Sequence, residues 1–326
     1  MKKRRFLRWI FGILTLLIVV MLALLIYVRQ FLPDVSLKEV TVEVTPERVE
    51  RGRYLANHVM VCMDCHSTRD WAKFAGPLVP GTEGKGGERF DQAVGIPGVF
   101  ISPNITPFHL KDWSDAELYR VITSGVGKNN KPIFPIMPYL NYGKMDDEDI
   151  YSVIAYIRTL PEKESEVPAP QVDFPMNFIL HLIPAEGRPA PVPPKSDIVN
   201  YGKYMVNAAA CMDCHTPFEK GQLLTDQAFT GGREFITPNG VLVSPNITPD
   251  KQSGIGNWSK EMFVSRFKNF DPKANGYQEV NEGAFNTLMP WTMYAGMDTT
   301  DLEAIYAYLA TLKPVEKQIT RFMSKN

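Results

Sequence analysis

The sequence predicts an all-α protein in which an N-terminal transmembrane helix precedes two tandem domains of the same design. Five motifs recur in the same order in both halves, each half closes on apolar residues at helical spacing, and an uncharged apolar run lies near the N-terminus. A chain of 326 residues is long enough for two modest domains. The predicted segments are a basic tip with a transmembrane anchor (residues 1–28), a tether (29–44), a first domain (45–165), a proline-rich linker (166–195), a second domain (196–314) and a tail (315–326).

The composition is that of an ordinary globular protein, with 44% hydrophobic and 22% charged residues. The formal net charge is -1. A near-neutral chain lacks the basic surface that nucleic-acid binding requires, so we expect no nucleic-acid partner.

The transmembrane prediction depends on residues 1–30. Five basic residues between Lys2 and Arg8 precede Trp9–Val28, which contains no charged residue and is about long enough to cross a bilayer as a helix. The basic cluster should stay in the cytoplasm, which places the following domains on the periplasmic side of the cytoplasmic (inner) membrane. The alternative is a cleaved signal peptide, but the run is long and residues 26–30 lack small side chains for cleavage. We favour an uncleaved anchor.

Each half contains three main predicted helices. In the first half, Thr45 followed by Pro46 begins one helix, and Ser114 with Glu117 forms a capping box that begins the second. The third, at residues 149–160, has apolar residues at spacings of three and four. In the second half, the first corresponding helix begins after Ser196, the second spans residues 260–269 and the third spans residues 301–312.

Internal repeats show that the two halves are duplicated domains. Besides a cysteine motif and the closing helix, each half contains the sequence Ser-Pro-Asn-Ile-Thr-Pro, then Trp-Ser, then Met-Pro. These begin at Ser102, Trp113 and Met137 in the first half, and at Ser244, Trp258 and Met289 in the second.

The cysteine motif indicates the cofactor. Cys62-Met63-Asp64-Cys65-His66 and Cys211-Met212-Asp213-Cys214-His215 both read C-x-x-C-H and contain all four cysteines of the chain. In this motif the two thiols attach covalently to a c-type haem and the histidine ligates its iron. We therefore predict two haems, each bound by its cysteine pair and by His66 or His215.

The sixth iron ligands are predicted to be Met137 and Met289, which lie 71 and 74 residues after their histidines. Their repeated position and the following proline distinguish them from the other methionines, although Met145, Met293 and Met297 remain alternatives. A thioether favours ferrous iron and fills the axial site, so His/Met ligation implies electron transfer without substrate binding at the iron.

Two further pairs are candidates for binding the haem propionates. They are Trp113 with Trp258 and Asn104 with Asn246, and the alternative is that the tryptophans are core residues and the asparagines hold turns. Gly52 and Gly202 lie inside predicted helices, where glycine costs about 1 kcal/mol relative to alanine. We interpret them as points of close helix crossing against Tyr156 or Tyr308. The glycine-rich loop at residues 81–87 lacks a complete phosphate-binding pattern and is expected to be flexible.

Two other uses of the cysteine pairs are disfavoured. Four thiolates can form a zinc site, but here the pairs lie 149 residues apart and each belongs to its own repeated unit. A redox-active dithiol of the thioredoxin type needs a strand-to-helix context that this sequence lacks.

With these motifs in place, the sequence resembles tandem class I cytochromes c. It is more specifically similar to the dihaem and multihaem cytochrome c subunits of periplasmic dehydrogenases, such as those for alcohol and gluconate. The resemblance rests on the two C-M-D-C-H motifs, the S-P-N-I-T-P, Trp-Ser and Met-Pro segments and the closing aromatic helices, which together cover residues 45–314. It implies a periplasmic electron-transfer protein without catalysis of its own, which relays single electrons between a dehydrogenase and a downstream acceptor. A dihaem peroxidase-like enzyme and a structural haem subunit of a respiratory complex are the alternatives.

Overall fold

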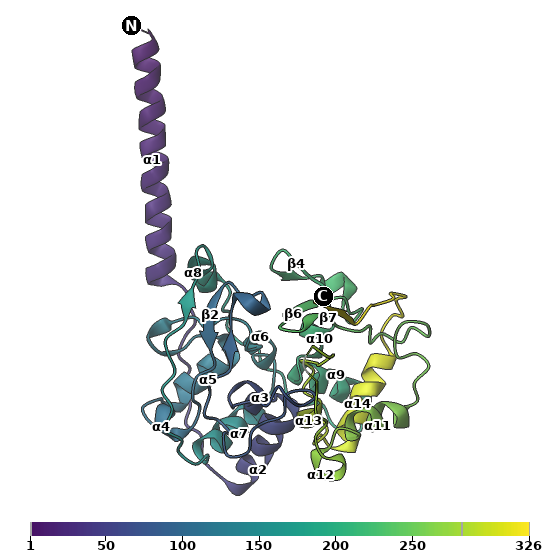
Figure 1. Cartoon of the computed structure of the whole chain (residues 1–326). Helices are drawn as coiled ribbons and strands as arrows, with labels where there is room; N and C mark the ends of the chain where they lie inside the picture. The colour runs from purple at the N-terminus through teal and green to yellow at the C-terminus, as the bar shows by residue number, and fades with distance from the viewer. Residues whose placement is uncertain (1, 282, 326) are drawn as a thin grey trace.

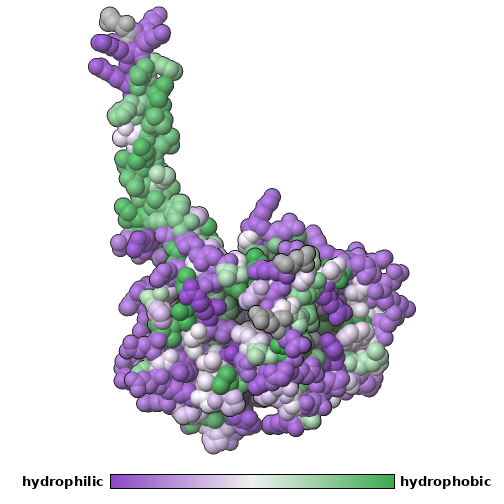
Figure 2. Space-filling model, in the orientation of Figure 1, coloured by the Kyte–Doolittle hydropathy of each residue, from purple (hydrophilic) through white to green (hydrophobic). Residues whose placement is uncertain are grey.

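A long apolar helix projects from two helical domains in the computed structural model, which describes residues 2–281 and 283–325 (Figure 1). This helix, α1 (Lys2–Phe31), is the one element of the described chain long and apolar enough to cross a membrane, with a mean hydropathy of 3.0 over its most apolar window. Figure 2 shows a hydrophilic tip followed by a largely apolar surface along α1, with hydrophilic residues again where the helix meets the first domain. The helix therefore has the length and surface expected of the predicted anchor.

The first two predicted helices of the first domain begin where the sequence predicts, whereas the third begins at Asp147, two residues before its predicted start. Thr45 caps α2, and Ser114 forms a capping box with Glu117 at the start of α5. The elements of this domain are α2 (Pro46–Tyr54), η1 (Leu55–Val59), α3 (Cys62–Cys65), β1 (Arg89–Phe90), η2 (Gln92–Val94), β2 (Gly98–Ile101), α4 (Pro107–Leu110), α5 (Asp115–Ser124), η3 (Lys128–Asn130), α6 (Tyr139–Tyr142) and α7 (Asp147–Arg158).

The second domain repeats the three main helices, the cysteine turn and the strand pair in the same order, and differs in its short additional elements. Its first helix is capped by Asp197 and not by Ser196, so the predicted start was one residue early. The elements are α9 (Ile198–Ala208), α10 (Cys211–Cys214), β4 (Phe218–Glu219), β5 (Gln222–Leu223), η5 (Thr225–Gln227), β6 (Glu234–Thr237), β7 (Gly240–Val243), α11 (Lys260–Lys268), α12 (Pro272–Asn275), α13 (Trp291–Tyr294) and α14 (Thr299–Ala310).

The all-α prediction was incomplete, because each domain also contains a small antiparallel sheet. In the first domain the order is β1-β2-β3, and β3 (Gln171–Val172) comes from the predicted linker. In the second domain the order is β6-β7-β8, and β8 (Phe322–Ser324) comes from the predicted tail. The segment after each closing helix thus returns to its own domain. These strands have two to four residues, too few for an alternating pattern to identify them.

The first and last helices of each domain cross at a glycine, as predicted. A Cβ atom on Gly52 would lie 1.8 Å from the carbonyl oxygen of Ser152 and 2.8 Å from the Cβ of Tyr156. A Cβ atom on Gly202 would lie 1.8 Å from the carbonyl oxygen of Ala304. Only glycine therefore permits this contact between α2 and α7, and between α9 and α14.

The two copies differ in the turn that leads to the cysteine motif. Tyr54 precedes its cysteine by eight residues and Tyr204 precedes its cysteine by seven. The extra residue is accommodated by η1, a π-helical turn in which the N–H of Met60 donates to the carbonyl of Leu55. A π-bulge is the usual way to insert one residue into a helix without changing the direction of its ends.

Candidate haem sites

Each cysteine motif forms a single helical turn entered through a left-handed residue. Val61 (φ 48°) precedes α3 and Ala210 (φ 51°) precedes α10. The cysteines of a pair therefore lie at the two ends of one short turn, and all four thiols are free. A pair of free thiols followed at once by histidine is the arrangement that covalent haem attachment requires.

The histidine of each motif is oriented by a carbonyl of the repeated Ser-Pro-Asn-Ile-Thr-Pro segment. The Nδ1 atom of His66 lies 2.8 Å from the carbonyl oxygen of Pro103, and the Nδ1 atom of His215 lies 2.9 Å from that of Pro245. Because a carbonyl only accepts, Nδ1 carries the hydrogen and Nε2 keeps its lone pair. Burial also lowers the pKa of both imidazoles, which keeps them neutral. These rings fit the role of iron ligands.

A glycine in left-handed conformation joins the histidine backbone to the same segment. The N–H of Gly86 donates to the carbonyl of His66 at 2.8 Å, and that of Gly231 donates to the carbonyl of His215 at 2.8 Å. A Cβ on Gly86 (φ +75°) would lie 2.6 Å from the carbonyl oxygen of Ser102. Gly86 is thus tightly packed, whereas a Cβ on Gly81 or Gly87 would meet nothing within 4 Å, and the flexibility of the loop at residues 81–87 stays a prediction. The signal in the sequence was a repeated Gly-Gly pair, at residues 86–87 and 231–232.

Asn104 and Asn246 are buried, and both the nitrogen and the oxygen of each side-chain amide form hydrogen bonds within the protein. The Nδ2 atom of Asn104 donates to the carbonyls of Lys163 and Ser165, and its Oδ1 accepts from the N–H and hydroxyl of Thr106. Asn246 makes the corresponding bonds to Thr248, Ser253 and Val315. The structure thus favours the role of turn-holding residues over propionate binding.

Trp113 and Trp258 are partly buried and pack against the core. The backbone N–H of each donates to a carbonyl three residues earlier. Within residues 2–281 and 283–325, no hydrogen bond engages either indole N–H. Both indoles are thus free to donate, and propionate binding by the two tryptophans stays a prediction.

Met137 and Met289 occupy equivalent positions in the two domains. Each is partly buried against the core and lies two residues before a short helix whose N-cap is the following proline, at α6 and α13. The alternative residues Met145, Met293 and Met297 are at most 7% exposed and fill the core. These positions favour Met137 and Met289 as sixth ligands, which remains a prediction.

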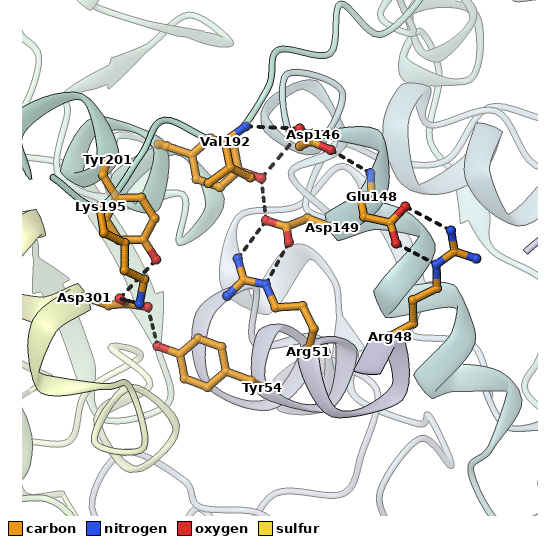
Figure 3. A network of polar contacts seen from close by, with 11 residues as sticks. Arg48, Arg51, Tyr54, Asp146, Glu148, Asp149, Val192, Lys195, Tyr201 and Asp301 are labelled. Carbon is orange, nitrogen blue, oxygen red and sulfur yellow. Dashed lines mark hydrogen bonds and ion pairs between the residues drawn. The ribbon is translucent and has the colours of Figure 1, made fainter. Parts of the chain in front are cut away.

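The two domains contact each other through a pseudo-twofold polar interface (Figure 3). The hydroxyl of Tyr204 donates to Asp149 at 2.6 Å, and the hydroxyl of the repeat-equivalent Tyr54 donates to Asp301 at 2.7 Å. The first helix of each domain thus binds the last helix of the other. Burial raises the pKa of both tyrosines, with the neighbouring carboxylate adding to the effect, so the hydroxyls remain donors.

Both interface carboxylates are buried and have further partners. Asp149 forms a bidentate pair with Arg51 at 2.8 and 2.9 Å. Asp301 accepts from Lys195 and Tyr201, each at 3.1 Å. Buried carboxylates need such complete pairing, because an unpaired buried charge is strongly destabilising.

A second set of interface contacts lies beside the cysteine motifs. The Nδ1 atom of His58 is 2.9 Å from the carbonyl oxygen of Met293, and the Nδ2 atom of Asn207 donates to the carbonyl of Asn141 at 2.9 Å. Each donor lies four residues before the first cysteine of its motif. The side chain of Asn141 also donates to Asp213 at 2.9 Å, inside the second motif. This bond joins the segment after Met137 in one domain to the haem-attachment turn of the other.

Comparisons with known proteins agree with this architecture. The cytochrome c family model matches residues 49–161 and 199–313. The fructose dehydrogenase cytochrome subunit of Gluconobacter japonicus is 30% identical over 65% of this chain and 43% of its own length. The cytochrome c subunit of a quinone-dependent alcohol dehydrogenase of Gluconacetobacter polyoxogenes is 26% identical over 82% of this chain and 56% of its own. This chain therefore spans about half the length of these subunits.

A relative of similar length also matches. A dihaem c-type cytochrome of Cereibacter sphaeroides is 26% identical over 78% of this chain and 83% of its own length. The two family matches cover more than half of the sequence, and each contains one complete C-x-x-C-H motif with its oriented histidine. On this evidence the chain belongs to the cytochrome c family.

Proposed function

We propose that this protein is a membrane-anchored dihaem cytochrome c that relays single electrons from a dehydrogenase to a downstream acceptor on the periplasmic side of the cytoplasmic membrane. The observation that supports it best is the direct bond from Asn141 to Asp213, which joins the two haem sites across the domain interface. Two sites connected in this way suit passage of an electron from one to the other.

In this proposal the chain positions the cofactors and performs no bond-making step. Haem iron supplies one-electron chemistry when it is bound. Cys62 and Cys65 would hold the first haem and Cys211 and Cys214 the second, while His66 and His215 would ligate the irons through Nε2. Met137 and Met289 would supply the remaining protein ligand to each iron.

The proposed electron donor is a dehydrogenase, because several relatives are cytochrome subunits of fructose, alcohol or gluconate dehydrogenases. The proposed anchor is α1, whose basic tip remains in the cytoplasm. Redox partners of cytochromes dock transiently on small surfaces, so the complex is expected to be weak in the absence of a shared membrane.

Spectroscopy of the purified full-length protein tests the haem assignment. We expect two haems per chain and two low-spin His/Met signals in the oxidised state. A high-spin haem that reacts with hydrogen peroxide would instead support the peroxidase-like alternative.

Purification from membranes tests the partner and the anchor. A tagged full-length chain should co-purify with a dehydrogenase whose substrate then reduces both haems. A version that carries a cleavable signal in place of residues 1–28 should form soluble holoprotein. If substrate of the co-purified enzyme reduces neither haem, the relay function is wrong.

A further inference from the structure

Four large apolar side chains are exposed where the end of α1 meets the first domain. They belong to the last turn of α1, to the loop before α8 (Met176–Ile179), to α8 itself and to η4 (Leu180–Leu182). We call them the juxtamembrane patch, and their exposed fractions are 67% for Phe31, 79% for Phe174, 39% for Ile179 and 60% for Leu182. Such a group of exposed apolar side chains indicates a surface that another apolar phase covers.

The segment that carries the patch is firmly attached to the first domain. Just before Phe174, β3 pairs with β2, with Val172 opposite Gly98. The side chain of Asp173 accepts a hydrogen bond from Gln92 at 3.0 Å. Between Ile179 and Leu182, Leu180 is only 4% exposed. The domain therefore presents these side chains on a supported surface and not on a free linker.

The patch lies at the level of the last turns of α1. Both α8 and η4 contact α1 (Figure 1), and within residues 2–31 only Leu25 and Val28 are partly covered. The ring of His181 bonds through Nδ1 to the carbonyl of Leu32 at 2.7 Å. These contacts hold α8 and η4 beside the periplasmic end of the apolar run.

The length of the apolar run then sets the depth of the patch. Trp9–Val28 contains twenty residues, which at a rise of about 1.5 Å per residue span roughly 30 Å, the thickness of the hydrocarbon core. If its basic end stays in the cytoplasm, Val28 lies at the opposite boundary of that core. The elements α8 and η4, which contact the partly covered end of α1, therefore reach the region between acyl chains and headgroups.

We propose that the juxtamembrane patch is a second membrane contact, in which Phe174, Ile179 and Leu182 insert into the headgroup–acyl boundary of the periplasmic leaflet. The partner is the lipid bilayer itself, because α1 brings the patch to lipid depth. Apolar and aromatic side chains at this depth bind the interface as a surface-lying amphipathic helix does. The proposal rests on α1 crossing the membrane as proposed above. Two contacts, unlike one, fix the tilt of the haem domains relative to the membrane.

Photo-crosslinking of the full-length holoprotein in phosphatidylcholine–phosphatidylglycerol vesicles tests this contact. Three variants are compared: Phe174→p-benzoylphenylalanine in the patch, Phe11→p-benzoylphenylalanine inside α1 as the positive control, and Tyr277→p-benzoylphenylalanine on the second domain as the negative control. Mass spectrometry then identifies what each probe has captured. We expect phospholipid adducts at positions 174 and 11, at least severalfold more abundant than at position 277.

Each other result overturns the proposal in a recognisable way. Lipid adducts at position 11 without adducts at position 174 would show that the anchor is correct and the patch is not a lipid contact. Adducts of position 174 with a second copy of the chain would show a protein interface. If position 11 also captures no lipid, the transmembrane anchor itself fails and the patch proposal fails with it.

Discussion

At the scale of single residues, the His66 and His215 side chains depend on atoms far from them in sequence. Each ring is oriented by the carbonyl of a proline, Pro103 or Pro245, in the Ser-Pro-Asn-Ile-Thr-Pro repeat. The sequence identified this repeat as a landmark and suggested a role only for its asparagines. Its role is to fix the ring tautomer and to anchor, through Asn104 or Asn246, the segment that carries the carbonyl.

The predicted sixth ligands can be tested by removing one thioether at a time. Met137→Ala or Met289→Ala should lower the midpoint potential of one haem by more than about 59 mV, the shift that changes a one-electron equilibrium tenfold. The physical reason is that loss of the thioether removes a ligand that favours ferrous iron. A redox titration measures the shift, with the exposed Met262→Ala as the control. Unchanged potentials in both variants would show that other residues are the ligands.

The packing of the left-handed glycines can be tested with a matched pair in the second domain. Gly231 (φ +70°) and Gly221 (φ +82°) have similar backbone conformations. A Cβ on Gly231 would lie 2.5 Å from the carbonyl oxygen of Ser244, whereas a Cβ on Gly221 would meet nothing within 4 Å. Gly221→Ala should cost only the left-handed penalty of roughly 1–2 kcal/mol. Gly231→Ala should cost more and also shift the potential of the second haem. Equal unfolding free energies in denaturant titration would contradict this interpretation.

At the scale of elements, the contact between the first and last helix of each domain depends on a bare backbone. Glycine weakens a helix by about 1 kcal/mol relative to alanine, so local propensity alone favours Ala at position 202. Tertiary packing reverses that preference, because the carbonyl oxygen of Ala304 is 1.8 Å from the position of the missing Cβ.

Gly202→Ala should therefore destabilise the protein, although it raises helix propensity. We expect a loss of at least about 1–3 kcal/mol from overpacking, measured as unfolding free energy in guanidinium chloride. The neighbouring exposed Lys203→Ala is the control and should change stability by less than about 0.5 kcal/mol. A stabilised Gly202→Ala variant would mean that α9 and α14 do not cross this closely.

At the scale of the whole molecule, the two domains contact each other through a symmetric interface, in which equivalent residues of the two copies make equivalent contacts. Tyr54 and Tyr204 make the same contact in opposite directions, and so do His58 and Asn207. A symmetric interface uses one surface twice, so each favourable contact is obtained twice. These contacts join the two domains close to their cysteine motifs.

The paired tyrosine hydroxyls should stabilise the interface. Tyr204→Phe removes a buried donor to Asp149 and should cost about 1.5–3 kcal/mol, the usual value for a hydrogen bond to a charged group. Tyr54→Phe should behave similarly at Asp301. The exposed Tyr277→Phe serves as the control in denaturant unfolding followed by haem absorbance. A loss no larger than in the control would show that the interface does not depend on these bonds.

Acid should weaken the same interface through His58. Burial lowers the pKa of His58, and Arg53, Lys268 and Lys273 lower it further. The unfolded chain, with a histidine pKa near 6.5, then binds more protons than the folded chain at lower pH, so stability is lost as pH falls below about 6.5. His58→Asn, which copies Asn207, should flatten the decline in melting temperature between pH 7 and 5. The same decline in both proteins would contradict this role.

The sequence by itself determined the cofactor, the duplication and the helices. These features are encoded locally: C-x-x-C-H is five adjacent residues, and caps such as Thr45 and Ser114 act within one turn. Even the glycine crossings were predictable, because Gly52 and Gly202 are costly in a helix unless another backbone approaches.

Only the tertiary structure decided which distant atoms meet. The strands β3 and β8, the carbonyls that orient His66 and His215, and the bond from Asn141 to Asp213 all pair residues far apart in the chain. Such pairings leave no periodic pattern in the sequence. A single hydrogen bond requires one donor atom and one acceptor atom, and it does not restrict the types of the neighbouring residues. The side chains of Asn104 and Asn246 illustrate this, since their amides suit a propionate or a turn equally and only the surrounding carbonyls decide between the two.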